Sequence, residues 1–178
     1  GVGTNRMNIY TVGKASQGLA DYLKKHYKNP SVAIAYDSRI KSDVFAKLAA
    51  GILAANGIQV HIWPQLMPVP ALSYAVRSLK ADAGIVVTAS HNPSKYNGYK
   101  VYGADGGQIT SKAAEEILGE IEKLDIFQDV QQDDFEDALA AGTIRYISDD
   151  VYTEFVEAVK QQSVLCGDEI DKNIAIVY

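Results

Sequence analysis

Three short strand-like runs separated by helix-like segments constrain the fold of this chain more than any other feature. The runs are Val32–Tyr36, Ile58–Trp63 and Ala83–Val87. Val32–Tyr36 and Ala83–Val87 are continuously apolar, which is typical of parallel strands that are covered on both faces. Two successive strand-helix-strand units predict right-handed crossovers and a largely parallel sheet with helices packed on both of its faces.

The segments around these runs carry apolar residues at helical spacing. One helix is expected over residues 11–27, and another follows the first strand, with Ser42 as its N-cap and Gly57 in a left-handed conformation at its end. A third helix is expected to start at Pro70 and to run to Leu79. The chain therefore alternates strands and helices in the order of an α/β domain.

The rest of the chain adds one strand and three helices to this pattern. After the Asn97-Gly98 turn, residues 99–102 form a short strand, which we expect to run antiparallel at the edge of the sheet. Amphipathic spacing predicts further helices around 114–124, 133–141 and 151–159. The predicted fold class is a three-layer α/β domain with a mostly parallel sheet, an antiparallel edge strand and helices on both faces.

Charge and cysteine content exclude several partners. The net charge of −5 repels phosphate backbones and anionic lipids, so neither nucleic acid nor a membrane is expected as a partner. Cys166 is the only cysteine and cannot form an internal disulfide, which favours a reducing compartment such as the cytoplasm.

The ends of the chain suggest that it is part of something longer. We expect residues 1–163 to form one domain, 164–173 a linker, and 174–178 the truncated first strand of a second domain. The last of these segments is a β-branched run with nothing after it, and the chain starts without a methionine.

Reactive and turn-forming residues are concentrated directly after the third predicted strand, in Thr88–Pro93. Ligands of open α/β sheets bind at the carboxyl ends of strands, so this loop lies where a site is expected. Ser90 could display its hydroxyl there while backbone N–H groups of the loop hold an anion. A single loop serine is more often only a turn residue.

A longer match gives Ser90 its significance. The string Thr88–Pro93, followed by Tyr96–Lys100, resembles the phosphoserine loop of the α-D-phosphohexomutase family. Gly3–Asn8, Asp37–Arg39 and Pro68–Arg77 resemble the phosphoglucomutase and phosphomannomutase branch of that family. The resemblance covers nearly the whole chain.

The resemblance implies a mechanism. Ser90 would carry a phosphate and donate it to a hexose 1-phosphate or 6-phosphate, which gives a bound hexose 1,6-bisphosphate that returns its other phosphate. Mg²⁺ would bind through the phosphate on Ser90. Lys100 matches the family's active-site lysine, as a proton shuttle or an electrostatic clamp. His91 would either bond the phosphate or only shape the loop, and Arg39 and Arg6 stay outside the catalytic set.

The resemblance also implies that further parts of the site lie elsewhere. The family's metal, sugar-recognition and phosphate-binding loops belong to domains II–IV of the same polypeptide, so this chain alone is expected to be inactive on its sugar phosphate substrate. A non-catalytic sugar-phosphate-binding or assembly module of the same fold is the alternative. A serine hydrolase that uses Ser90 and His91 is a third reading, in which no acidic partner for the histidine is evident.

Overall fold

A five-stranded sheet forms the centre of the computed structural model, which describes residues 2–4, 6–164, 173–175 and 177. Its strands lie in the order β4-β3-β1-β2-β5. The bounds are β1 (Ser31–Tyr36), β2 (Gln59–Ile62), β3 (Ala83–Val87), β4 (Tyr99–Gly103) and β5 (Ile144–Tyr146). All neighbouring pairs are parallel except β3 and β4, so the predicted antiparallel edge strand is confirmed.

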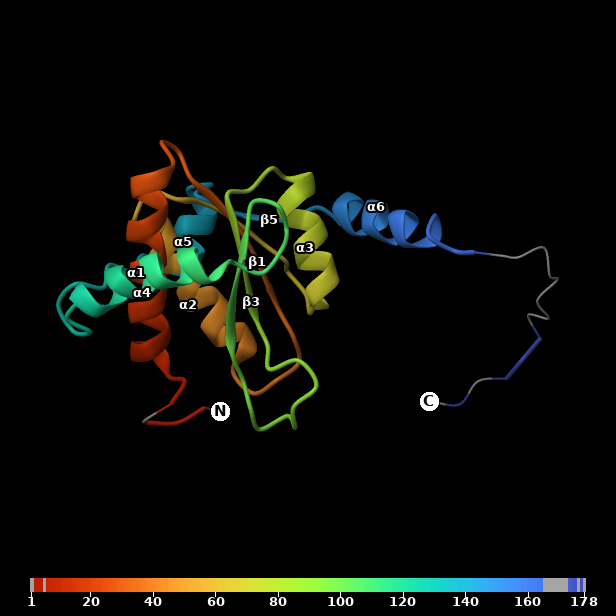
Figure 1. Ribbon diagram of the computed structural model, residues 1–178, viewed down its shortest axis with the longest axis horizontal. Coiled ribbons are helices and arrows are strands. Elements are labelled where there is room, and N and C mark those ends of the chain that lie inside the picture. The colour runs from red at the N-terminus through yellow and green to blue at the C-terminus, as the bar shows by residue number, and fades with distance from the viewer. Residues whose placement is uncertain (1, 5, 165–172, 176, 178) are drawn as a thin grey trace.

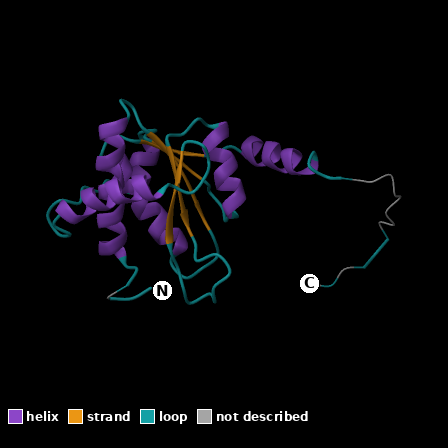
Figure 2. Cartoon of the chain, viewed as in Figure 1, coloured by secondary structure: helices purple, strands orange, loops and turns teal. Residues whose placement is uncertain are grey.

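Helices cover both faces of this sheet (Figures 1 and 2). They are α1 (Ile9–His26), α2 (Ser42–Ala55), α3 (Val69–Ser78), α4 (Ser111–Lys123), α5 (Phe135–Ala140) and α6 (Asp149–Lys160). One face packs mainly against α1 and α2, and the other packs against α3 and α6. The three-layer α/β class predicted from the sequence is therefore confirmed. Within the described ranges, no helix is both long and apolar enough to cross a bilayer.

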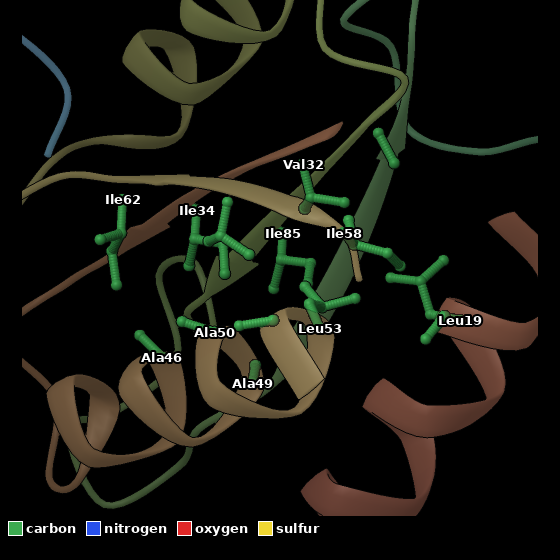
Figure 3. Packing of buried hydrophobic residues seen from close by; sticks show 14 of the residues in the cluster. Leu19, Val32, Ile34, Ala46, Ala49, Ala50, Leu53, Ile58, Ile62 and Ile85 are labelled. Carbon is green, nitrogen blue, oxygen red and sulfur yellow. The ribbon is translucent and has the colours of Figure 1, made fainter. Parts of the chain in front are cut away.

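One buried cluster lies between the sheet and α2, where strand and helix side chains interdigitate (Figure 3), and a second lies on the face that α3 and α6 cover. Ile34 and Ile85 of neighbouring strands face Ala49 and Leu53 of α2, and all four are fully buried. The alanines of α2 let the helix approach the strands closely, so the larger strand side chains fill the space between them. This packing fixes β1 and β3, the two strands that lead into the candidate site.

Most predicted helix ends are correct to within a few residues, and the differences have local causes. The first helix begins at Ile9 because Asn8 and Thr11 form a reciprocal capping box. Ser42 is not the N-cap of α2: that position is Lys41, in the left-handed region at φ 65°, and no side chain caps the helix. The Ser42 hydroxyl instead donates to Asp37, which is a better acceptor because it is charged.

The prediction missed β5. This strand is three residues long and only Ile144 is buried, so it has too few positions to show an alternating pattern. It pairs with β2 through Val60 and Ile62. The predicted linker 164–173 lies largely outside the described residues. Of the predicted strand 174–178, residues 174, 175 and 177 are described and are not assigned to a strand. The division into domain, linker and second domain stays a prediction.

Gly18 allows α1 and α4 to pack closely. A Cβ at Gly18 would overlap the Ile121 side chain and lie 3.0 Å from the Ile121 backbone nitrogen. Gly119, on α4, offers a matched comparison because a Cβ there would meet nothing within 4 Å. Alanine substitutions at the two glycines therefore separate the effect of helix propensity on stability from the effect of helix packing.

We predict that Gly18→Ala lowers the free energy of unfolding by about 1–3 kcal/mol, because the added methyl group forces the two helices apart. Gly119→Ala should leave it unchanged or raise it by up to about 1 kcal/mol, because alanine favours the helix. Urea titrations of both variants measure the difference. Equal stabilities for the two variants would contradict the packing argument.

Candidate functional site

The candidate site lies at the carboxyl edge of the sheet, where β1 and β3 end side by side. Tyr36 and Val87 are register partners at the ends of these strands, so Asp37 and Thr88 follow them at the same edge. The loop from β3 to β4, residues 88–98, projects from this edge beyond the body of the sheet (Figure 1). We call residues 88–98 the Ser90 loop.

Asp37 is the hub of this edge. Its Oδ1 accepts hydrogen bonds from the Arg39 backbone N–H and the Ser42 hydroxyl, each at 3.0 Å. Its Oδ2 accepts from Arg39 Nε at 2.9 Å and from the Thr88 hydroxyl at 2.5 Å. Asn97 joins the network because its Nδ2 donates to Ser42 Oγ at 2.9 Å. One carboxylate therefore ties β1, α2 and both ends of the Ser90 loop.

The environment of Asp37 keeps it ionised. Burial alone raises the pKa of this carboxyl, but the hydrogen bonds from Thr88, Arg39 and Ser42 together outweigh burial and hold the pKa below its ordinary value. The carboxylate is thus held in the charged form that the four donors require.

Arg39 connects Asp37 to the Ser90 loop. Its Nη1 donates to the carbonyls of Pro93 at 2.8 Å and Tyr96 at 3.1 Å. Its Nη2 donates to the carbonyls of Ser90 and Asn92, both at 2.6 Å. The Arg39 side chain is only 10% exposed, although the loop residues that it bonds are themselves exposed.

Ser90 adopts an unusual backbone conformation, with φ at 57° in the left-handed region. Its N–H donates to Thr88 Oγ1 at 3.0 Å, and its carbonyl is held by Arg39. A left-handed non-glycine residue costs about 1–3 kcal/mol and persists only where its surroundings enforce it. The flanking hydrogen bonds supply that enforcement and leave the hydroxyl exposed.

His91 is exposed next to Ser90, and its Nδ1 lies 3.4 Å from Ser90 Oγ. A serine hydrolase would need a third group to orient this histidine. In the part of the chain that the structure describes, no carboxylate forms an ion pair or hydrogen bond with His91. The acidic residue that a serine hydrolase needs to orient its histidine is therefore not found beside His91.

Ser90 and His91 open onto a depression of about 370 Å³. Its other lining residues come from the ends of β1 and β3 and from the start of α3: Asp37, Thr88, Met67, Pro68, Val69 and Pro70. The N-terminus of α3 thus shares a depression with the Ser90 hydroxyl, and the positive end of a helix dipole favours an anion there. A larger hollow of about 480 Å³ between α1, α2 and residues 126–135 shares no residue with it.

Lys100 lies on β4, opposite Val86 of β3, and is half-buried. Its neighbours Tyr99 and Val101 pack toward α1, so strand alternation places Lys100 on the opposite face, the one that α3 covers. Tyr99 anchors the strand from the other side, because its hydroxyl lies 3.1 Å from the buried Ser16 Oγ. Within the described residues, no hydrogen bond joins Lys100 to Ser90 or His91.

Arg6 lies near the far end of the Ser90 loop. Together with Asn97 and Gly98 it lines a separate shallow depression of about 360 Å³. Arg6 and Arg39 therefore occupy different places, and neither lines the depression at Ser90 among the residues that the structure describes.

This edge of the sheet holds no ready-made ligand set for a divalent cation. Across the described ranges, no three His, Cys, Asp or Glu residues are grouped so that they could hold a metal ion. Asp37 is the carboxylate that bonds to the Ser90 loop, and the hydrogen bonds that it accepts come from protein donors. A cation at Ser90 would therefore need ligands beyond these side chains, such as the oxygens of a phosphate.

Comparison with known proteins identifies the family. Residues 1–127 match the family model described as phosphoglucomutase/phosphomannomutase, alpha/beta/alpha domain I. The chain belongs to this family. A phosphoglucomutase from Staphylococcus saprophyticus is 39% identical over 160 residues, which is 90% of this chain and 29% of that protein. A phosphoglucomutase from Staphylococcus haemolyticus is 36% identical over the whole chain and 32% of its own length.

Solved structures agree with this assignment. The crystal structure of a Thermus thermophilus protein described as a phosphomannomutase superposes with a TM-score of 0.77 at 27% identity, over 93% of this chain and 35% of that protein. The chain thus spans about a third of the length of the relatives that it matches, and corresponds to domain I of a multidomain phosphohexomutase.

The sequence predicted Ser90, His91 and Lys100 as site residues of this domain, and that assignment stays a prediction. The sequence did not predict the hydrogen-bond network that Asp37 and Arg39 form. The signal was available, because Asp37-Ser38-Arg39 follows a strand that is adjacent to the strand before Ser90. Arg39 stayed outside the catalytic set because structural ion pairs explain such arginines as often as phosphate contacts do. The structure contains that ion pair and directs the rest of the guanidinium to backbone carbonyls.

The lowered pKa of Asp37 predicts a pH dependence of stability. The carboxyl has an ordinary pKa of about 3.9 in the unfolded chain and a lower one when folded, so its stabilising contribution is complete above about pH 5. The contribution is lost as the pH falls through the folded pKa. Asp37→Asn should therefore be less stable at pH 7 and lose less stability between about pH 5 and pH 3.

Urea titrations across this pH range measure the effect. Glu122→Gln, at an exposed position on α4, serves as the control and should keep the wild-type slope. An Asp37→Asn variant with the same slope as wild type would show that the carboxyl gains nothing from its four donors.

Proposed function

We propose that Ser90 is the phosphate carrier of a phosphohexomutase and that this chain supplies the domain that holds it. In the first half-reaction the O–P bond of phosphorylated Ser90 breaks, and an O–P bond forms to a hydroxyl of a hexose phosphate. The proton of that hydroxyl ends on Ser90 Oγ, which balances the transfer. The reverse step with the other phosphate of the hexose 1,6-bisphosphate regenerates the phosphoserine and releases the isomeric product.

The observation that carries this proposal is the enforced conformation of Ser90. A left-handed serine with an exposed hydroxyl, fixed through both flanking peptides, suits a reaction that depends on in-line positioning more than on covalent machinery. The depression beside it begins at a helix N-terminus, which favours the negative charge that a phosphoserine would bring. The family membership agrees with this role.

Lys100 and His91 are proposed to assist Ser90. Lys100 lies on the α3 face of β4, where a cation would complement phosphate charge as an electrostatic clamp or move the proton of the substrate hydroxyl. His91 Nδ1, at 3.4 Å from Ser90 Oγ, is close enough to exchange a hydrogen bond with the hydroxyl or with a phosphate on it. The position of Lys100 on the α3 face of β4 supports its role, and the short distance from His91 Nδ1 to Ser90 Oγ supports the role of His91.

Mg²⁺ is proposed as the resident cation, held on this chain through the phosphate of Ser90 alone. When bound, it supplies neutralisation of charge on the phosphoryl oxygens. The protein's own part is the rigid presentation of the serine, since Asp37 is already engaged with four donors.

The whole reaction is proposed for a longer polypeptide. The relatives are about three times as long as the part that this chain matches, so domains II–IV would provide the remaining sugar, phosphate and metal contacts. The preferred sugar stays open among the glucose, mannose and pentose phosphates. We propose residues 1–163 as domain I, followed by a linker and the start of domain II. Cytoplasmic localisation stays a prediction from the single cysteine.

We predict that the full-length enzyme carries one phosphate on Ser90 and that Ser90→Ala abolishes turnover of glucose 1-phosphate in Mg²⁺, because no other group receives the phosphoryl group. Intact mass, phosphopeptide mapping and a coupled assay measure the two effects. Ser94→Ala, a neighbouring exposed serine of the same loop, is the matched control and should retain both phosphate and activity. The 178-residue chain by itself should show no turnover.

Two outcomes would contradict the proposal. Phosphate that maps to another residue, or activity that survives Ser90→Ala, would remove Ser90 from the reaction. A full-length protein that binds hexose bisphosphate with neither phosphorylation nor turnover would instead favour a non-catalytic sugar-phosphate-binding module.

A further inference from the structure

Arg39 uses its whole donor capacity on the Ser90 loop and its anchor. A guanidinium has five N–H donors in a fixed planar fork. One donates to Asp37, and the other four donate to the carbonyls of Ser90, Asn92, Pro93 and Tyr96. Since the side chain is only 10% exposed and its charge is paired with Asp37, it is not available as a direct ligand for a phosphate in the depression.

These bonds fix which way the peptide groups of the loop face. The chain has no cis peptide bonds among its described residues, and in a trans peptide the C=O and the following N–H point in opposite directions. When Arg39 holds the Ser90 carbonyl, the N–H of His91 faces away from the guanidinium. The Pro93 carbonyl likewise turns the N–H of Ser94 outward.

The outward N–H groups are free to donate. In the part of the chain that the structure describes, the backbone N–H of His91 and that of Ser94 form no hydrogen bond within the protein. The N–H groups of Ser90, Asn92 and Tyr96, in contrast, are all satisfied inside the loop. Among the described residues, the N–H groups of Ala89, Lys95 and Asn97 likewise form no hydrogen bond. The His91 N–H differs from them in its place, because it directly follows the serine whose hydroxyl is exposed.

On the proposed function of Ser90, we propose that Arg39 is a positioning residue for phosphoryl transfer. By turning the Ser90 carbonyl inward, Arg39 removes a partial negative charge from the side of the phosphate and presents the His91 N–H to it. The His91 backbone thus becomes the donor that binds phosphoryl oxygens on Ser90, as anion-binding loops do. Arg39 acts through the loop and touches no reacting atom.

Arg39→Lys tests the role of the fork, because it keeps the positive charge. A lysine ammonium has three donors on a compact head and cannot reach four carbonyls and Asp37 together. Amide hydrogen exchange of the 178-residue chain should show faster exchange across residues 88–98 in this variant, with the amides of β1 and β3 still protected. Arg145→Lys is the matched control, because Arg145 donates to one carbonyl, that of Gly142.

The kinetic arm uses the full-length enzyme. Single-turnover transfer from phosphorylated Ser90 to glucose 1-phosphate should slow by about 10²-fold in Arg39→Lys, as expected for a misplaced reacting group, with KM little changed. Arg145→Lys should transfer at the wild-type rate. Arg39→Gln provides a second variant with the same expected result if Arg39→Lys does not fold.

The outcomes separate this inference from the function on which it rests. Wild-type exchange in the loop, or a wild-type transfer rate, in Arg39→Lys would overturn the positioning role, since charge alone would then suffice. A uniform rise of exchange over the whole domain would also overturn it, because Arg39 would act only on global stability. A wild-type enzyme without phosphate on Ser90 would overturn the proposed function, while the exchange arm would still report whether Arg39 holds the loop.

Discussion

The ion pair between Asp37 and Arg39 is the interaction on which the candidate site depends. A partly exposed ion pair contributes little by itself. This pair matters because each partner makes further hydrogen bonds. The carboxylate also accepts hydrogen bonds from Ser42 and Thr88, and the guanidinium also donates to four loop carbonyls. Removing either partner would leave several polar groups beneath the loop without their hydrogen bonds, and such losses cost more than the pair itself contributes.

The surrounding packing makes that network possible. The buried strands β1 and β3 place Asp37 and Thr88 at adjacent positions of the sheet edge, and the small residues of α2 allow the helix to lie close beneath them. On the far side of the loop, Gly98 returns the chain to β4. A Cβ there would lie 2.6 Å from the Thr88 carbonyl oxygen, so the close return is open only to glycine. Core packing thus sets the position of the loop, and polar bonds set its conformation.

The sequence could predict the elements that have a long hydrophobic pattern or that are buried on all sides. The buried runs of β1 and β3 and the amphipathic α2 belong to this class, and so does Gly57, whose φ of 75° matches the expected left-handed end. Family resemblance predicted Ser90 and Lys100 as site residues, and this stays a prediction. The strand β5 was not predicted because a single buried residue shows no alternating pattern. Ser42 was wrongly predicted as an N-cap because its hydroxyl donates to the carboxylate of Asp37, five residues earlier, and does not accept from the first turn of the helix. The role of Arg39 depends on contacts with residues more than fifty positions away, which no local pattern encodes.

Both borders of the sheet are closed to further strands. At one border, β5 is three residues long and exposes Arg145 and Tyr146. At the other, the chain folds back on β4, where Tyr102 bridges to Gln108 and the Ile109 N–H donates to the Val101 carbonyl. Short, charged or covered edge strands disfavour edge-to-edge pairing between sheets. The two edges of this sheet therefore disfavour the addition of a strand from another segment or another molecule, and the strands that position the Ser90 loop pair only within this domain among the described residues.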